Sequence, residues 1–380
     1  MKIIGDWLTY PETQALCLAL ETSGHRALFV GGCVRNALLG VPVGDTDLAT
    51  DALPKTVSNI AENAGFKVIP TGIDHGTVTV VAGGRPHEVT TFRRDVETDG
   101  RRAVVAFSSD IAEDAARRDF TMNALYADRH GTVIDPLGGL PDLRARRVRF
   151  VGDAETRIRE DYLRILRFFR FHAAHGDPDQ GLDSDALAAC AALSAGLETI
   201  SKERIGAEMR KLLAAADPTP ALSAMAQTGI LARILPGADP RAVGPLVHLD
   251  PRADWLCRLA ALGGADPVQH LRLSKAEARD LTDLRDAVGS GETAAALGWR
   301  LGRQRGWDAI LLRAALMEQP LAQAAKDEIA RGAVARFPVS AADLMPTLQD
   351  RALGTRLKQL ERRWLASDLT LGRDDLLKGA

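Results

Sequence analysis

The sequence has few cysteines, few aromatic residues and no long apolar run. Its four cysteines among 380 residues lie far apart and form no Cys-x-x-Cys pair. This spacing argues against a disulfide scaffold, a cysteine zinc site or a dithiol redox site. No apolar stretch approaches the ~18 residues of a membrane span, and the start lacks the apolar core of a signal peptide. We therefore expect a cytoplasmic protein with reduced thiols and no membrane partner.

The chain also lacks an excess of charge of either sign. It has 48 basic and 50 acidic residues, a net charge of −2, and this excludes a uniformly basic nucleic-acid coat but leaves room for a local basic surface. Hydrophobic residues make up 46%, so wholesale disorder is excluded. The length favours two or three domains.

Strand and helix patterns divide the chain. Apolar, β-branched runs bounded by glycine or proline predict strands in the first third, at 27–30, 66–69, 77–81 and 87–92. From about residue 153 the period is helical, with proline-rich breaks at 217–220 and 236–240. We predict an α/β head (residues 1–150), a helical neck (151–216) and a helical body and tail (217–380).

Two aspartates, Asp45 and Asp47, follow a Gly31-Gly32 pair that ends the first strand. If this segment is extended, both carboxylates project from one face. They can then bridge two Mg²⁺ ions, which activate an attacking hydroxyl and stabilise the leaving oxygen of a phosphoryl transfer. For Asp-x-Asp alone an acidic turn is the commoner explanation, but the glycine pair and the strand before it favour the metal site.

Residues on either side of this pair extend the candidate site. The Gly31-Gly32 turn lets phosphate oxygens approach backbone amides at the start of a helix, with Arg35 as a charge partner. Glu88 lies inside a strand pattern that disfavours glutamate. It either faces water from an edge strand or serves as a third catalytic carboxylate facing the same metals.

Two charged segments follow. In Arg117-Arg118-Asp119, an arginine can grip triphosphate oxygens and the carboxylate can accept a ribose hydroxyl, unless the cluster is only a solvated helix start. The segment 157–169 predicts one amphipathic helix, and the alternative for its polar face is a set of solvated salt bridges. That face carries Arg157, Glu160, Asp161, Arg164 and Arg167.

These motifs together resemble one family. Residues 31–40 with 45–50 are similar to the first motif of class II tRNA nucleotidyltransferases, the bacterial CCA-adding enzymes and their poly(A) polymerase relatives. Residues 117–125, 134–143, 160–164 and 200–213 resemble later motifs of the same family in the same order. One departure is Asn36, where the family usually has aspartate.

The resemblance implies a polymerase β-like nucleotidyltransferase head, a neck (151–216) that recognises the base, and a helical body and tail (217–380) that bind tRNA. It also assigns roles to several residues. It implies ribose and phosphate contacts from Arg118, Asp119 and Asn123, and base recognition by Asp161, Arg164 and Arg167. Cytosine and adenine both present an amine beside a ring-nitrogen acceptor, so a carboxylate and an arginine can pair with either. Guanine and uracil leave these contacts unpaired, and a site built on hydrogen bonds rejects them.

The implied reaction is the addition of C, C and A to the 3′ end of tRNA without a template. CTP and ATP are the substrates, Mg²⁺ is the cofactor, pyrophosphate is released, and no obligate protein partner is evident. The charged segment 93–102 is most simply a hairpin turn exposed to water, but it resembles a flexible loop of the family and so favours complete CCA addition. Arginines between 144 and 170 predict a phosphate-binding surface, unless they only form salt bridges with nearby acids. Alternatives are a poly(A) polymerase, an enzyme that adds only C or only A, and an RNA-binding protein with an inactive site.

Overall fold

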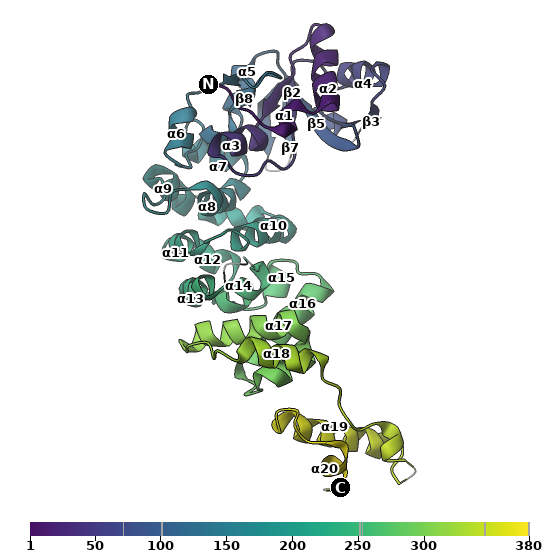
Figure 1. The fold of residues 1–380 in the computed structure, drawn as a ribbon. Helices are drawn as coiled ribbons and strands as arrows, with labels where there is room; N and C mark the ends of the chain where they lie inside the picture. The colour runs from purple at the N-terminus through teal and green to yellow at the C-terminus, as the bar shows by residue number, and fades with distance from the viewer. Residues whose placement is uncertain (71, 100–101, 251, 253, 346, 379–380) are drawn as a thin grey trace. The chain divides into compact units, whose positions relative to one another are not determined.

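The computed structural model describes residues 1–70, 72–99, 102–250, 252, 254–345 and 347–378. The chain forms two compact units, an N-terminal unit of Met1–Ser201 and a C-terminal unit of Lys202–Ala380. The finer boundaries predicted at residues 150 and 216 stay predictions. Each unit is described by itself below (Figure 1).

A mixed seven-stranded sheet forms the centre of the N-terminal unit. Its strand order is β3-β4-β5-β2-β1-β8-β9. Neighbouring strands are antiparallel except for β2 and β5, which run parallel. The bounds are β1 (Leu28–Val30), β2 (Leu48–Thr50), β3 (Lys67–Ile69), β4 (Thr77–Ala82), β5 (Arg85–Thr91), β8 (Tyr126–Ala127) and β9 (Val133–Ile134). The four strands expected from the sequence are all present, and the predicted α/β head is confirmed.

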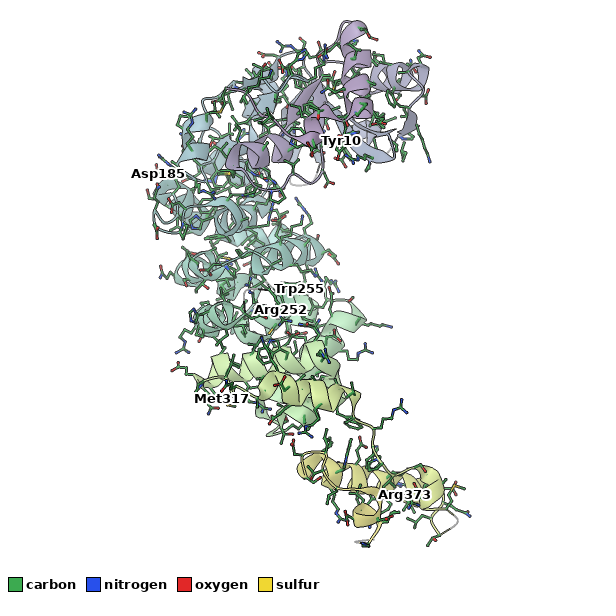
Figure 2. The ribbon with its side chains drawn as sticks, in the orientation of Figure 1. Tyr10, Asp185, Arg252, Trp255, Met317 and Arg373 are labelled. Atoms are coloured by element: carbon green, nitrogen blue, oxygen red, sulfur yellow. The ribbon has the colours of Figure 1, made fainter. Side chains whose placement is uncertain are left out.

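Helices cover this sheet. After the short α1 (Asp6–Thr9), both α2 (Pro11–Thr22) and α4 (Pro54–Asn63) begin with proline, whose fixed φ suits the first helical position. They pack against each other (Figure 1) and against β4. Tyr10 lies directly before α2 (Figure 2). The centre of its ring is 3.4 Å from the guanidinium carbon of Arg85 in β5, so the start of the helix contacts the sheet. On the sheet, α3 (Gly32–Leu39) follows β1 directly.

The charged segment that follows residue 92 forms a two-stranded ribbon, as expected of a hairpin. Strands β6 (Arg93–Asp99) and β7 (Arg102–Phe107) pair antiparallel, while Gly100 and Arg101 at its expected turn lie outside the described residues. The ribbon leads into α5 (Ile111–Ala116) and the short helix η2 (Thr121–Asn123).

The predicted single helix over 157–169 is wrong. The structure has two helices, α7 (Ala154–Glu160) and α8 (Leu163–His175), separated by Asp161 in an extended conformation with φ −155°. The Asp161 carboxylate accepts a hydrogen bond from the Leu163 amide at 3.1 Å, which competes with helix continuation and starts α8. The other helices of this unit are α6 (Leu140–Arg144), α9 (Ser184–Ala192), η1 (Ile73–His75) and η3 (Ser194–Thr199).

Every regular element in the described part of the C-terminal unit is a helix. They are α10 (Lys202–Leu213), α11 (Thr219–Gln227), α12 (Ile230–Ile234), η4 (Pro240–Ala242), α13 (Val243–Leu249), α14 (Trp255–Leu262), α15 (Pro267–His270), α16 (Lys275–Gly289), α17 (Ala294–Met317), α18 (Ala325–Val334), η5 (Ala341–Asp343), α19 (Asp350–Ala366) and α20 (Arg373–Leu377). The proline-rich segments 217–220 and 236–240 both interrupt helices, as predicted. Among the described residues, no helix is long and apolar enough to cross a membrane.

Candidate active site

Three carboxylates gather at one end of the central strands. Asp45 and Asp47 lie in the segment just before β2, rather than within a strand, and Glu88 lies in β5. Strands β2 and β5 are parallel, and Leu48 lies opposite Val89. Asp47 and Glu88, the residues directly before this pair, therefore occupy corresponding positions on the two neighbouring segments. Strand β5 is central, so the alternative of an edge-strand glutamate is excluded, although Glu88 is exposed.

The electrostatics of Asp47 show that these groups interact. Burial, followed by the charges of Glu88 and Asp45, raises the pKa of Asp47 to about 6, and the guanidinium of Arg118 opposes the rise. Carboxylates that repel each other in this way are a donor set that a divalent cation would stabilise. No group of three or more His, Cys, Asp or Glu side chains within the described ranges has the geometry of a metal site. The metal assignments therefore stay predictions.

His87 fixes this acidic segment from the opposite face of β5, and the sequence analysis missed it. Its Nδ1 lies 3.1 Å from the carbonyl oxygen of Thr46, between the two aspartates, and its Nε2 lies 3.2 Å from the Thr13 hydroxyl of α2. The side chain is 1% exposed, and burial lowers its pKa. The signal that could have found it is strand alternation, because His87 precedes Glu88 and must point to the other face.

The glycine turn joins the acidic segment to the arginine motif. Gly31 has φ +70°, a conformation that L residues rarely adopt, and its amide bonds to the Leu125 carbonyl at 3.2 Å. A Cβ at Gly31 would lie 3.5 Å from Nη1 of Arg118. The preceding amide, Val30, donates to the Asp47 carbonyl at 3.1 Å. This turn therefore brings Arg118 close to the aspartate pair.

Arg118 is held by two residues that the sequence analysis did not single out. Its Nη2 donates to Asp114 at 3.0 Å and its Nε to the Tyr126 hydroxyl at 3.1 Å. Tyr126 in turn donates to Asp114 at 2.6 Å. Burial opposes ionisation of Asp114, but the charges of Arg118 and Arg117 lower its pKa below the ordinary value. The buried tyrosine and carboxylate thus fix the orientation of Arg118.

A chain of hydrogen bonds connects α3 with α8. Arg35 donates to Asn123 Oδ1 at 2.6 Å, and Asn123 Nδ2 donates to Asp119 Oδ1 at 2.9 Å. The other oxygen of Asp119 accepts from Arg167 Nε at 2.8 Å. Four residues predicted from three motifs therefore form one chain of contacts. Asp119 is 8% exposed and holds Arg167 in place, so its ribose contact stays a prediction.

Asn36, the departure from the family pattern, forms hydrogen bonds with two residues. It accepts hydrogen bonds from Arg35 Nε at 3.1 Å and Nη2 at 2.9 Å, and its amide nitrogen donates to the Pro42 carbonyl at 2.9 Å. A carboxylate here could not donate the bond to Pro42. The asparagine thereby connects Arg35 with the segment that leads to Asp45 and Asp47.

The break between α7 and α8 determines the position of Arg164. Its Nη1 donates to the Arg157 carbonyl at 2.8 Å and to the Glu160 carboxylate, and its Nη2 donates to the Arg117 carbonyl at 3.2 Å. A guanidinium has five N–H donors, so Nε–H and one Nη2 hydrogen have no partner among the described residues. Arg164 is thus anchored on one side and can donate on the other.

The Poly A polymerase head domain family matches residues 27–149, and the family described as "Probable RNA and SrmB- binding site of polymerase A" matches residues 181–241. The mitochondrial CCA tRNA nucleotidyltransferase 1 of Mus musculus is 32% identical over 380 residues, covering 93% of this chain and 86% of that protein. The chain belongs to the CCA tRNA nucleotidyltransferase family. The predicted resemblance is confirmed, and enzymes of this family generally use divalent metal ions.

Other relatives define how far the similarity extends. The CCA-adding enzyme of Geobacillus thermodenitrificans is 44% identical over 255 residues, which is 66% of this chain but only 58% of that protein. Among solved structures, the Bacillus stearothermophilus CCA-adding enzyme in complex with CTP has a TM-score of 0.77 at 31% identity, covering 95% of this chain and 94% of that one. The Thermotoga maritima enzyme complexed with tRNA, at 17% identity and TM-score 0.68, shares the fold.

Proposed function

We propose that this protein adds C, C and A to the 3′ end of tRNA, using CTP and ATP without a nucleic-acid template. The observation that carries the proposal is the set of contacts that joins the aspartate segment, Arg118, Asn123 and Arg167 within one unit. Membership of the CCA tRNA nucleotidyltransferase family and the similarity to an enzyme solved with CTP support the same reaction.

In the proposed reaction the 3′-hydroxyl oxygen of tRNA bonds to the α-phosphorus of the nucleotide. The bond from that phosphorus to the bridging oxygen breaks, pyrophosphate leaves, and the hydroxyl proton is released. Asp45 and Asp47 would hold Mg²⁺, with Glu88 as a third carboxylate, and the bound metal would polarise the attacking and leaving oxygens. Arg118 and Arg35 would bind phosphate oxygens, because both guanidinium groups are fixed close to the glycine turn.

Selection of the base is assigned to α7 and α8. The Asp161 carboxylate would accept from the exocyclic amine of cytosine or adenine, while the remaining donors of Arg164 would bond the neighbouring ring nitrogen. Glu160 orients Arg164 through their ion pair. Uracil and guanine would leave both groups unpaired, which is costly in a half-buried site.

A tRNA transcript that lacks its 3′ end tests the proposal. We expect two additions with CTP alone and a single terminal A once both nucleotides are present. A long tail with ATP alone would instead support a poly(A) polymerase, the second candidate, which the names of both matching families favour. Addition of only C or only A would identify a partial enzyme, and no pyrophosphate release would support an inactive RNA-binding protein.

A further inference from the structure

His87 supplies a hydrogen bond at the place where the ladder between β2 and β5 begins. Strand β2 starts at Leu48, which lies opposite Val89 of the parallel strand β5. Two residues earlier the same register would put Thr46 opposite His87, but residues 41–47 are neither helix nor strand. At this point the imidazole Nδ1 lies 3.1 Å from the Thr46 carbonyl oxygen. A side-chain bond therefore holds the acidic segment where the backbone ladder does not reach it.

The two peptide groups that flank Asp47 are both held in this way. The Thr46 carbonyl belongs to the planar peptide unit that contains the Asp47 amide, so the bond from His87 fixes that plane. The carbonyl of Asp47 itself accepts from the Val30 amide at 3.1 Å. Because both planes are fixed, the direction of the Cα–Cβ bond of Asp47 is fixed as well. The positions that its carboxylate can reach are limited accordingly.

The ring of His87 is in turn held from its other end. A carbonyl oxygen can only accept, so Nδ1 carries the hydrogen, and in the neutral ring Nε2 accepts from the Thr13 hydroxyl at 3.2 Å. His87 and Thr13 are each 1% exposed, so water does not compete for these bonds. A buried chain of hydrogen bonds thus runs from α2 through β5 to the acidic segment.

We propose that His87 is a positioning residue for the nucleotidyl transfer, because it holds the Asp47 carboxylate in the orientation that binds a divalent cation. Mg²⁺ is usually bound by one or two carboxylates together with substrate phosphates and water, so the position of each carboxylate matters. Replacing a residue that orients a metal ligand changes metal affinity or activity by about 10- to 100-fold. The inference rests on the proposed function for the identity of the reaction, whereas metal affinity is measured without it.

Three replacements separate the two ends of the imidazole. The amide nitrogen of asparagine comes close to the position of Nδ1, so His87→Asn keeps a donor for Thr46. The longer His87→Gln places its amide near the position of Nε2 and keeps only the contact with Thr13. His87→Leu removes both bonds at a similar volume. Binding of Mn²⁺, which also prefers carboxylates, is measured by electron paramagnetic resonance on the full chain without nucleotide or RNA.

We expect the Mn²⁺ dissociation constant to rise by roughly tenfold in His87→Gln and His87→Leu, and by about threefold or less in His87→Asn. In nucleotide addition, the Mg²⁺ concentration for half-maximal rate should rise in the same order. At limiting Mg²⁺ kcat should fall while the KM for tRNA stays unchanged, and saturating Mg²⁺ should restore most of kcat.

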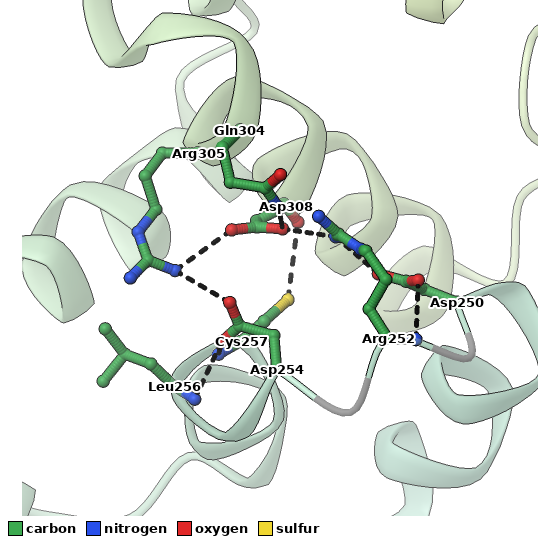
Figure 3. A network of polar contacts seen from close by, with 8 residues as sticks. All are labelled: Asp250, Arg252, Asp254, Leu256, Cys257, Gln304, Arg305 and Asp308. Carbon is green, nitrogen blue, oxygen red and sulfur yellow. Dashed lines mark hydrogen bonds and ion pairs between the residues drawn. The ribbon is translucent and has the colours of Figure 1, made fainter. Parts of the chain in front are cut away.

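Two control variants lose buried hydrogen bonds elsewhere. Thr91, on the same face of β5, is 1% exposed and donates to the Ala52 carbonyl at 2.7 Å, a bond that Thr91→Val removes. In the C-terminal unit, Asp308 is fully buried and accepts from Arg252 at 2.6 Å and from Arg305 at 3.0 Å (Figure 3). Thr91→Val and Asp308→Asn should both lower the thermal midpoint and leave the Mn²⁺ dissociation constant unchanged.

The possible outcomes separate the inference from the proposed function. The same Mn²⁺ dissociation constant in His87→Leu and the wild type, or no Mn²⁺ binding to the wild type, would overturn the inference. Equal losses in His87→Asn and His87→Leu, or an equal loss in the two controls, would overturn it as well. Weaker Mn²⁺ binding in His87→Leu alongside a wild type that adds no nucleotide would support the role of His87 and contradict the proposed function.

Discussion

Arg167 in α8 donates from Nε to Oδ2 of Asp119 at 2.8 Å, and this ion pair joins the helical part of the N-terminal unit to the arginine motif of the head. Burial opposes ionisation of Asp119, but the charge of Arg167 and hydrogen bonds from Asn123 and the Phe120 amide hold its pKa below the ordinary value. The position of Arg167 therefore depends on a buried carboxylate from another motif.

Replacement of Asp119 by asparagine should affect both stability and nucleotide binding. We expect Asp119→Asn to lower the free energy of unfolding by about 1.5–3 kcal/mol, because a hydrogen bond between charged groups is lost. It should also raise the KM for CTP and ATP, since Arg167 is released. Asp185→Asn, at an exposed position of α9 in the same unit, is the matched control and should leave both values unchanged. Nucleotide KM at the wild-type value would contradict the role of Asp119.

The same pair predicts an acid dependence of stability. A carboxyl group whose pKa is lowered by folding stabilises the fold at pH values above its unfolded pKa of about 3.9, and this contribution is lost as pH falls through the folded pKa. Wild-type protein should therefore lose stability more steeply below about pH 4 than Asp119→Asn. Parallel acid-unfolding curves for the two proteins would be the contrary result.

Repulsion among the three carboxylates predicts a response to metal. In the absence of Mg²⁺, Asp47→Asn should raise the thermal midpoint, because it removes a charge that Glu88 and Asp45 repel. Addition of Mg²⁺ should stabilise the wild type but not the variant, and the variant should be inactive. Glu62→Gln on α4 provides an exposed control. If Glu88→Gln left activity and Mg²⁺ dependence untouched, the assignment of Glu88 would be wrong.

Arg258 predicts a stability effect in the C-terminal unit. It is 2% exposed and donates to the carbonyls of Leu213, at 2.8 Å, Ala215 and Ala216, so it satisfies the end of α10. Arg258→Met should cost roughly 3 kcal/mol or more, since buried carbonyl groups lose charged donors. Chemical unfolding followed by hydrogen exchange at α10 would measure this cost. The exposed Arg279→Met should change stability by less than about 0.5 kcal/mol.

Base selection should depend on Arg164 and on the residue that orients it. Arg164→Ala or Asp161→Ala should relax the preference toward UTP and GTP. Each variant removes a protein group that uracil and guanine would leave without a hydrogen-bond partner. Glu160→Gln should show a smaller loss, because it weakens the ion pair but keeps both base contacts. Incorporation ratios for the four nucleotides measure these effects, and wild-type ratios in Arg164→Ala would rule out the assignment.

Local sequence patterns predicted much of the fold. The apolar runs that became β1, β3, β4 and β5 were recognisable because each is bounded by glycine or proline, and the proline-rich segments do interrupt helices. The break at Asp161 could not be read from helical periodicity, because apolar residues on both sides keep the same spacing. Only the side-chain bond to the Leu163 amide reveals it.

Candidate site residues could be proposed from the sequence where a single motif contains them, but not where their role depends on contacts between distant segments. Asp45, Asp47 and Arg118 follow from residue type and order. His87 contacts Thr46 and Thr13, which are 41 and 74 residues away, and Asp114 accepts from Tyr126, 12 residues away, so only the folded chain brings these partners together.

The most direct measurement offers the wild-type protein a tRNA transcript lacking its 3′ end, Mg²⁺ and all four nucleoside triphosphates together, and sequences the extended ends. The account predicts that the added residues read C, C, A and then stop. Tails of repeated A, or additions that contain U or G, would contradict it.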